Sequence, residues 1–259
     1  MEKDFDVPSD WYSSFFTAPV NFFWETMVPD AATEADVAFL GRHLAPPPAS
    51  LLDVPCGAGR HALALAREGH KVVAIDLSQE AVRRAQRAGK GLSATFRRGD
   101  MRSLDLQERF DGVLCLGNSL SYFPPGEMRA FIASLAERLA EGGRLILDTS
   151  CCAESLFPLA ETREVAFEGG TYRSRYSYDS RLSVLKTKAE LRLGEGVHPL
   201  LYAHYVVTSG ELVRMVEAAG LRVEGLFGDV EDTPFAPGMK RLLLVASRCA
   251  AAPRRRRVP

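Results

Sequence analysis

From Ser50 onward, short apolar runs alternate with stretches in which apolar residues recur at helical spacing. The runs "SLLDV", "KVVAI", "ATFR", "FDGVLCLG" and "RLILDT" have the length and composition of strands, and amphipathic stretches separate most of them. Alternation of this kind predicts a mostly parallel sheet that is covered by helices on both faces. The pattern therefore favours an α/β fold of the doubly wound type, with its first part in residues 49–150.

Several polar residues mark where the helices begin and end. Helix starts are predicted at Ser78, at Glu127 behind two prolines, and at Thr208, where T-x-x-E spacing makes a capping box. The "EGG" at 141–143 predicts the end of the second of these helices. A further helix is expected over about 33–44, ahead of the linker "APPPAS".

Beyond Ser150 the spacing of apolar residues changes to a period of two, with turn signals at 169–170, 179–181 and 194–196. This pattern predicts three or four antiparallel strands. After a helix that ends at Gly220, two more apolar runs predict a closing hairpin. The expected segments are an N-terminal aromatic and helical lid (1–48), a cofactor-binding core (49–150), a β-rich insertion on the substrate side (151–208), the last helix and two strands (209–249) and a flexible basic tail (250–259).

Aromatic residues are concentrated near the N-terminus, in "DWYSSFFTAPVNFFWETMVPD". One interpretation is a cover over the edge of a sheet. The other is a lid over a pocket, because this segment lies outside the repeating strand and helix pattern. The sequence leaves both interpretations open.

Charge and composition narrow the range of partners. The 259 residues carry 32 basic and 33 acidic side chains, and without the four arginines at 254–257 the formal charge of −1 becomes −1 − 4 = −5. A protein that grips nucleic acid should instead present a basic face, so the arginine run is interpreted as a solvated tail. No stretch approaches the ~20 apolar residues of a membrane span, and the acidic N-terminus does not resemble a signal peptide. We expect a cytoplasmic protein that binds neither nucleic acid nor membrane.

The five cysteines are odd in number and lack the paired CxxC spacing of zinc sites. We expect reduced, mostly buried thiols and no metal ion. Cys115 lies within a predicted strand and is assigned to the hydrophobic core, which speaks against a nucleophilic cysteine mechanism.

The run "LLDVPCGAGRHALALA" at 51–66 predicts a strand, a tight turn and a helix. Its turn matches G-x-G-x-x-G/A, so a dinucleotide-binding oxidoreductase must be considered. However, Asp53 lies four residues before Gly57, and its carboxylate would repel a pyrophosphate. A cofactor that places a cationic amine there would be attracted instead. S-adenosylmethionine (SAM) carries such an amine and no phosphate.

The stretch "LLDVPCGAGRHALALAREGHKVVAIDLS" resembles the first two motifs of class I SAM-dependent methyltransferases. Together with "GDMRSL" and "FDGVLCLGNSLSYF", it is similar to small-molecule enzymes of the glycine N-methyltransferase and amino-sugar N,N-dimethyltransferase type. Pro55 departs from the usual D-x-G-x-G-x-G pattern at the position of its first glycine. The resemblance implies a seven-stranded sheet of order 3-2-1-4-5-7-6, in which only the last strand is antiparallel.

The expected cofactor contacts follow the ends of successive strands. Asp76 closes the second strand, where its carboxylate can accept hydrogen bonds from both ribose hydroxyls. The resemblance places the adenine near Asp100 and Met101. The cofactor-binding residues expected for SAM, and for its product S-adenosylhomocysteine, are Asp53, Cys56, Gly57, Gly59, Asp76, Leu77, Asp100, Met101, Leu116 and Asn118.

Catalytic residues are harder to predict, because the sulfonium of SAM already activates the methyl group. Tyr122, in "CLGNSLSYF", should lie beside that methyl group. His204, in the β-rich insertion, could accept a proton from the nucleophile. The resemblance adds Tyr12, because related N-methyltransferases bring an N-terminal tyrosine toward the substrate.

The leading hypothesis is a methyltransferase that acts on nitrogen or oxygen of a small metabolite. Two alternatives remain at this point: an NAD-dependent oxidoreductase that uses the same glycine turn, and a SAM-binding protein without transferase activity. The sequence leaves the acceptor unidentified, and the protein could be a monomer or a homodimer.

Overall fold

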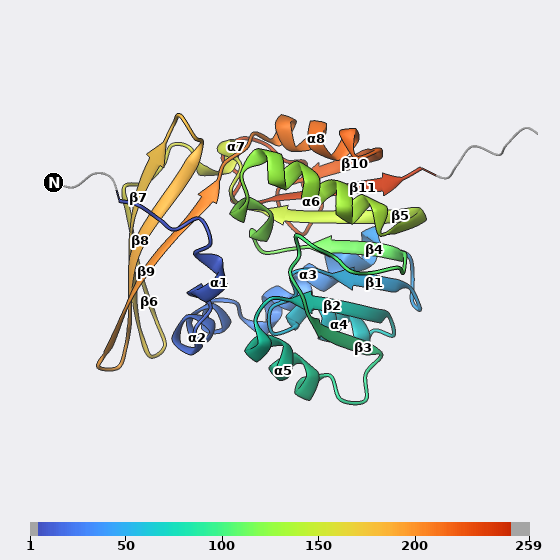
Figure 1. Ribbon diagram of the computed structural model, residues 1–259, viewed down its shortest axis with the longest axis horizontal. Coiled ribbons are helices and arrows are strands. Elements are labelled where there is room, and N and C mark those ends of the chain that lie inside the picture. Colours follow the sequence, from blue (N-terminus) through green and yellow to red (C-terminus); the bar gives the residue numbers. More distant parts are fainter. Residues whose placement is uncertain (1–4, 250–259) are drawn as a thin grey trace, which may run out of the picture.

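A computed structural model describes residues 5–249 and contains two sheets that lie side by side (Figure 1). The larger sheet has seven strands in the order β3-β2-β1-β4-β5-β11-β10. Its strands are β1 (Ser50–Asp53), β2 (Lys71–Asp76), β3 (Ala94–Arg98), β4 (Phe110–Cys115), β5 (Leu139–Thr149), β10 (Leu221–Phe227) and β11 (Leu242–Arg248). The arginine run at 254–257 lies outside the described residues.

Strand β11 alone runs antiparallel to the rest of this sheet. It pairs in antiparallel register with β5 on one side and with β10 on the other, whereas the pairs among β1 to β5 are parallel. This arrangement confirms the predicted order and the single antiparallel strand. The last strand in the sequence therefore lies inside the sheet, and β10 forms its edge.

The eight α-helices of residues 5–249 are α1 (Tyr12–Phe15), α2 (Ala18–Met27), α3 (Asp30–His43), α4 (Arg60–Arg67), α5 (Gln79–Ala88), α6 (Pro125–Glu137), α7 (Ala153–Leu156) and α8 (Ser209–Ala218), and a 3-10 helix spans Ser119–Tyr122. The predicted caps are present, because the Ser78 side chain accepts from the N–H of Ala81 and the Thr208 side chain from that of Glu211. None of these helices is long and apolar enough to cross a membrane.

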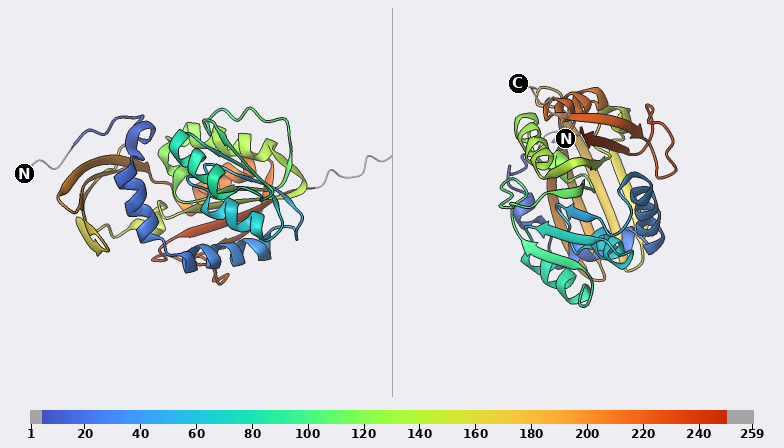
Figure 2. Two further views of the ribbon diagram at one scale, coloured as in Figure 1. Left: turned by 90° about the horizontal axis from the view of Figure 1, so that it is seen from below. Right: turned by 90° about the vertical axis from the view of Figure 1, so that its right-hand side faces the viewer.

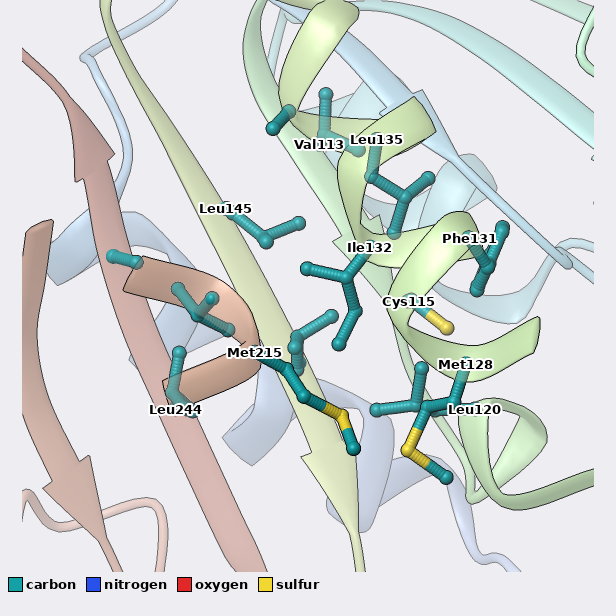
Figure 3. Close-up of a cluster of buried hydrophobic side chains, with 14 of the residues drawn as sticks. Val113, Cys115, Leu120, Met128, Phe131, Ile132, Leu135, Leu145, Met215 and Leu244 are labelled. Atoms are coloured by element: carbon teal, nitrogen blue, oxygen red, sulfur yellow. The ribbon is translucent and has the colours of Figure 1, made fainter. Parts of the chain in front are cut away.

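The sheet has a hydrophobic core on each face. Along β4, Val113 and Cys115 point to the face covered by α6 and α8, while Leu114 points to the face covered by α3, α4 and α5. Figure 3 shows the first core, in which residues of α6 and Met215 of α8 pack on β4, β5 and β11. Cys115 is completely buried there, as expected for a core residue.

The predicted helix stop at "EGG" is wrong. Helix α6 already ends at Glu137, and residues 141–143 belong to β5. Gly142 has a φ of +75°, and a Cβ on Gly143 would lie 2.9 Å from the carbonyl oxygen of Phe110. The two glycines therefore allow an irregularity in the pairing of β4 with β5, at the point where the register of the two strands shifts.

Residues 162–205 form the second sheet, with four antiparallel strands in sequence order. They are β6 (Thr162–Phe167), β7 (Gly170–Asp179), β8 (Val184–Leu193) and β9 (Gly196–Tyr205), and turns join them at the three predicted positions. This sheet confirms the expected antiparallel insertion after the fifth strand. It curves around the N-terminal helix α2, which lies on its inner face (Figure 2).

The N-terminal aromatic residues pack on this second sheet and do not cover the edge of the larger one. Trp11, Phe15 and Phe23 form a third hydrophobic cluster with the inner-face residues Tyr172 and Tyr202. Helices α1 and α2 thus lie between the two sheets (Figure 1), next to the ends of the strands that carry the predicted cofactor motifs.

Candidate functional site

A cavity of about 790 Å³ lies between the carboxyl ends of the central strands and helices α1 and α2. One wall comes from the turn after β1 and the segments after β2, β3 and β4. The other wall comes from residues 12–33. A volume of this size is typical of small-molecule sites, and open α/β sheets bind their ligands at this edge.

The glycine turn forms the floor of the cavity. Gly57 has a φ of +55°, and a Cβ built on it meets no atom within 4 Å, so a side chain there would occupy cavity space. Gly59 does not line the cavity. A Cβ on Gly59 would lie 2.8 Å from the ring of Phe96, so this glycine allows α4 to pack closely against β3 instead of allowing a ligand to approach.

Asp76 lies at the cavity wall, at the end of β2. Its Oδ2 accepts from the N–H of Gly57 at 2.8 Å, and its Oδ1 accepts from the N–H of Ser78 at 2.8 Å. Burial raises the pKa of this carboxyl, against the two N–H groups that lower it. The carboxylate therefore fixes the glycine turn and keeps free lone pairs for a ligand.

Asp53 lies beneath the turn and is only 1% exposed. It accepts from the N–H of Ala62, but its Oδ2 has no hydrogen-bond partner among the described residues. Burial raises the pKa of this carboxyl to about 7, although the charge of Arg60 acts in the opposite direction. Asp53 does not line the cavity, so it would act on a ligand by its charge from below.

Of the remaining expected cofactor residues, five line the cavity and one does not. Those at the wall are Cys56, Leu77, Asp100, Met101 and Leu116. Asn118 does not line it, because its side-chain oxygen accepts from the N–H of Ser150, at 2.5 Å, and from the Ser150 hydroxyl.

The two predicted tyrosines meet inside the cavity. The rings of Tyr12 and Tyr122 stack 5.9 Å apart with planes inclined by 9°. Arg102 lies over the ring of Tyr12 at 5.6 Å and makes a two-pronged ion pair with Asp100. Burial raises the pKa of both phenols, although the charge of Arg102 lowers that of Tyr12. Both tyrosines are therefore neutral hydrogen-bonding groups at physiological pH.

His204 does not line the cavity and lies behind Tyr122. Its ring centre is 5.6 Å from those of Tyr122 and Tyr202 and 5.8 Å from that of Trp11. Burial lowers the pKa of its imidazole to about 4, so the ring is neutral at pH 7. Its surroundings are aromatic, and of the three neighbouring rings Tyr122 lines the cavity while Trp11 and Tyr202 do not.

Sequence reasoning considered the N-terminal segment as a lid but named only Tyr12 in it, and it missed the lining residues in and next to helix α2. The cavity is lined by Asn21, Trp24 and Glu25, which lie on one face of α2 because their spacing is i, i+3 and i+4, and by Val28, which directly follows the helix. Glu25 also makes a two-pronged ion pair with Arg84 of α5, with oxygen to nitrogen distances of 2.7 and 2.8 Å. The helical period in "NFFWETMV" is the signal that could have identified these residues.

The charges at the cavity fit a cationic nucleoside better than a pyrophosphate. Asp53 and Asp76 lie at the turn, where a dinucleotide would place its phosphates. Two arginines of the lining are already paired, Arg60 with Asp36 at 2.9 Å and Arg84 with Glu25. Residues 5–249 contain no group of acidic, histidine and cysteine side chains that could hold a metal ion.

Comparisons with known proteins agree with the assignment of the cavity to a cationic nucleoside such as SAM. Residues 51–143 match the family model described as a methyltransferase domain. The chain is 30% identical over 207 residues to dTDP-3-amino-3,4,6-trideoxy-alpha-D-glucopyranose N,N-dimethyltransferase of Streptomyces venezuelae, with 76% of this chain and 86% of that relative covered. It is 26% identical over 216 residues to a cypemycin N-terminal methyltransferase of a Streptomyces species, with 82% and 88% covered.

Solved structures show the same architecture. The SAM-bound amino pentose methyltransferase of calicheamicin biosynthesis from Micromonospora echinaspora is 26% identical, with a TM-score of 0.67 over 91% of this chain and 98% of that chain. The fold of this chain therefore has a counterpart in a methyltransferase that was solved with SAM bound.

Proposed function

The chain belongs to the class I SAM-dependent methyltransferases that act on small molecules, and we propose that it methylates the amine nitrogen of a compact acceptor held between the glycine turn and helix α2. Membership of this family sets aside both the NAD-dependent oxidoreductase and the non-catalytic SAM-binding protein. Nitrogen is favoured over oxygen because the relatives of Streptomyces venezuelae and Streptomyces fradiae are named as N,N-dimethyltransferases of amino sugars.

We propose that SAM occupies the part of the cavity nearest the strands. Bound there, it supplies a methyl group on a positively charged sulfur. Asp76 would accept from the ribose hydroxyls, Asp100 and Met101 would flank the adenine, and Gly57 would allow the chain to approach the amino-acid end. Cys56, Leu77 and Leu116 would complete the cofactor wall, and Asp53 would balance positive charge from below.

The observation that carries the proposal is that one cavity joins this cofactor wall to residues of α1 and α2. We propose that 49–150 hold SAM and that the cavity-lining residues of 1–48 hold the acceptor. The last helix and two strands (209–249) would complete the core. The insertion (151–208) contributes no residue to the cavity lining and would support α1 and α2 through the third hydrophobic cluster. Tyr12 and Tyr122 would contact the acceptor, because both tyrosines line the cavity. His204 would support Tyr122 from behind. Location in the cytoplasm and a monomeric or homodimeric state stay predictions from the sequence.

These residues would align the acceptor with the methyl group of SAM and exclude water from the cavity. Tyr12 and Tyr122 have raised pKa values and keep their protons near neutral pH, and His204, with a pKa of about 4, is a weak base. None of the three would therefore accept a proton from the acceptor. An amine acceptor would therefore have to reach the cavity with its lone pair free. The two phenols would then orient it by hydrogen bonds, and the aromatic wall would keep water away.

The experiment is a pair of acceptors that differ only at the reacting atom. Purified enzyme with SAM is offered an amino sugar, free and nucleotide-linked, and the matching sugar with a hydroxyl group in place of the amine. Formation of S-adenosylhomocysteine and of methylated product is followed by mass spectrometry. We expect methyl transfer to the amine alone. Transfer to the hydroxyl compound instead would contradict the choice of nitrogen.

A further inference from the structure

Arg241, immediately before β11, joins two carboxylates that come from distant parts of the chain. Its Nη1 lies 2.9 Å from Oδ1 of Asp36 on α3. Its Nε and Nη2 lie 3.1 and 2.9 Å from the two carboxylate oxygens of Asp148 at the end of β5. The side chains of Asp36 and Asp148 are 8% and 11% exposed and that of Arg241 is 29% exposed. The three groups therefore form an ionic cluster with buried carboxylates and a half-buried guanidinium.

Each carboxylate holds a different wall of the cofactor cavity. Oδ2 of Asp148 accepts from the N–H of Gly117, which lines the cavity in the turn after β4. Oδ2 of Asp36 lies 3.0 Å from Nε2 of His61 and 2.9 Å from Nη1 of Arg60. Both of these residues line the cavity at the start of α4. One guanidinium group therefore connects the two segments that flank the glycine turn.

The charges in the cluster fix its hydrogen-bond directions. Burial would raise the pKa of Asp36, but the hydrogen bond from His61 and the charge of Arg241 hold it well below its usual range. Burial lowers the pKa of His61, so the neutral imidazole donates its Nε2 hydrogen to Asp36. Asp36 and Asp148 balance Arg60 and Arg241, so the cluster carries no net charge. The cluster favours one geometry, because each carboxylate oxygen of Asp36 and Asp148 has a hydrogen-bond partner.

We propose that Arg241 is a positioning residue for cofactor binding, which acts through Asp36 and Asp148 to set the distance between the His61 wall and the Gly117 wall of the cavity. This inference rests on the assignment of the cavity to SAM and is independent of the identity of the acceptor. Arg241 makes no direct contact with the cavity, because it is not among the lining residues. Its effect must therefore pass through the two carboxylates.

A neighbouring arginine offers a matched control. Arg248, the last residue of β11, donates from Nη1 to the backbone carbonyls of Ala136 and Leu139, away from the cavity. Arg248→Met removes comparable hydrogen bonds without touching either wall. Arg241→Met alone would leave two buried carboxylates without their shared cation. The first test variant is therefore a double substitution, Arg241→Met with Asp148→Asn, which we call the charge-balanced pair. The second test variant is Arg241→Lys.

The readout is the dissociation constant of S-adenosylhomocysteine by calorimetry, together with the melting temperature. We expect the charge-balanced pair to bind about tenfold more weakly than the wild type, because both walls lose their link. Arg241→Lys should bind about threefold more weakly, since an ammonium group is a point charge that cannot reproduce the forked contact. Arg248→Met should lower the melting temperature and leave the dissociation constant within about twofold of the wild type.

The proposal is overturned if the Arg241 variants fold and bind S-adenosylhomocysteine as tightly as Arg248→Met does. It is also overturned if all three variants lose affinity only in proportion to their loss of melting temperature. Should the charge-balanced pair fail to fold, Arg241→Lys alone decides. Failure of the proposed amine acceptor would appear in the turnover assay and would leave this binding series unchanged.

Discussion

At the scale of single residues, the carboxyl group of Asp53 is the most unusual group of the site. It is almost fully buried, one oxygen lacks a partner among residues 5–249, and its pKa lies near 7. A carboxyl in this state holds a proton for part of the physiological pH range. A cationic ligand above it favours the ionised form, so ligand binding and proton release should be coupled.

We predict that SAM binding releases a proton from Asp53. Because the pKa in the ligand-free protein is raised to about 7 and the positive ligand lowers it, SAM should bind more tightly as pH rises toward 7 and level off above it. At pH 7 the release should be about half a proton. Calorimetry in buffers of different ionisation enthalpy measures this number.

The matched variant is Asp53→Asn, in which the side-chain oxygen can still accept from the N–H of Ala62. It has no titrating group at this position, so its SAM affinity should not follow pH through this window. If Asp53→Asn released as many protons on SAM binding as the wild type, the proton would come from another group.

At the scale of elements, helix α2 serves two surfaces at once. Val20 and Phe23 are buried on the side of the third hydrophobic cluster, whereas Trp24 and Glu25 line the cavity. Helix α2 can therefore hold the second sheet with one side and close the cavity with the adjacent side. The ion pair of Glu25 with Arg84 ties it across to α5, but at about 40% exposure such a pair contributes at most about 1 kcal/mol.

Substitution of Trp24 should lower methyl transfer more than substitution of its neighbour. Trp24 is 40% exposed and lines the cavity, whereas Phe22 is 48% exposed and its ring lies beside Gly169 in the turn between β6 and β7. We expect Trp24→Ala to lower kcat/KM about tenfold, since an aromatic contact with a ligand contributes on the order of 1 kcal/mol. Steady-state kinetics on the folded variants measure this ratio.

Phe22→Ala is the control, because it removes a similar aromatic area from the same helix and should stay within about twofold of the wild type. Equal losses in the two variants would mean that α2 contributes by stability alone and that its inward face does not meet a ligand.

At the scale of the whole molecule, aromatic side chains join the two sheets into one unit. Tyr12, Tyr122 and Tyr205 each pack on both the core of the larger sheet and the third cluster. Trp11 lies between the two parts, with its ring centre 4.8 Å from that of Tyr122 and 5.7 Å from that of Tyr202. The cavity lies against this junction, so its shape depends on both sheets staying in contact.

We predict that the two parts unfold together and that Tyr122→Ala separates them. The sequence has two tryptophans, so in a Trp24→Phe background the fluorescence of Trp11 reports the junction while far-UV circular dichroism reports the whole chain. The two midpoints should coincide. With Tyr122→Ala, the junction should lose about 3 kcal/mol and melt several degrees earlier, as for other large core truncations.

Phe157→Ala provides the comparison, because the ring of Phe157 is 40% exposed and packs edge-on against Tyr178, away from Trp11. Its two midpoints should stay together. Coincident midpoints in Tyr122→Ala as well would mean that the remaining contacts suffice to couple the sheets.

The sequence by itself determined the parts of this protein that depend on local pattern. Alternating apolar runs and helical stretches, with the motif resemblance, predicted the seven-stranded order, and the caps at Ser78 and Thr208 followed from hydrogen bonds within one turn. Asp76, Asp100 and the glycine turn were found because strand ends in a parallel sheet converge on one edge.

Only the tertiary structure decided which side chains meet across that edge. The "EGG" of 141–143 resembles a helix stop, yet the pairing of β4 with β5 makes it part of a strand. The sequence suggested His204 as a base, but the structure buries it among aromatic rings, and burial lowers its pKa. The link from Asp36 to Arg241 spans most of the chain. Such contacts depend on how segments that are distant in the sequence pack together, and a pattern of a few residues carries no information about that packing.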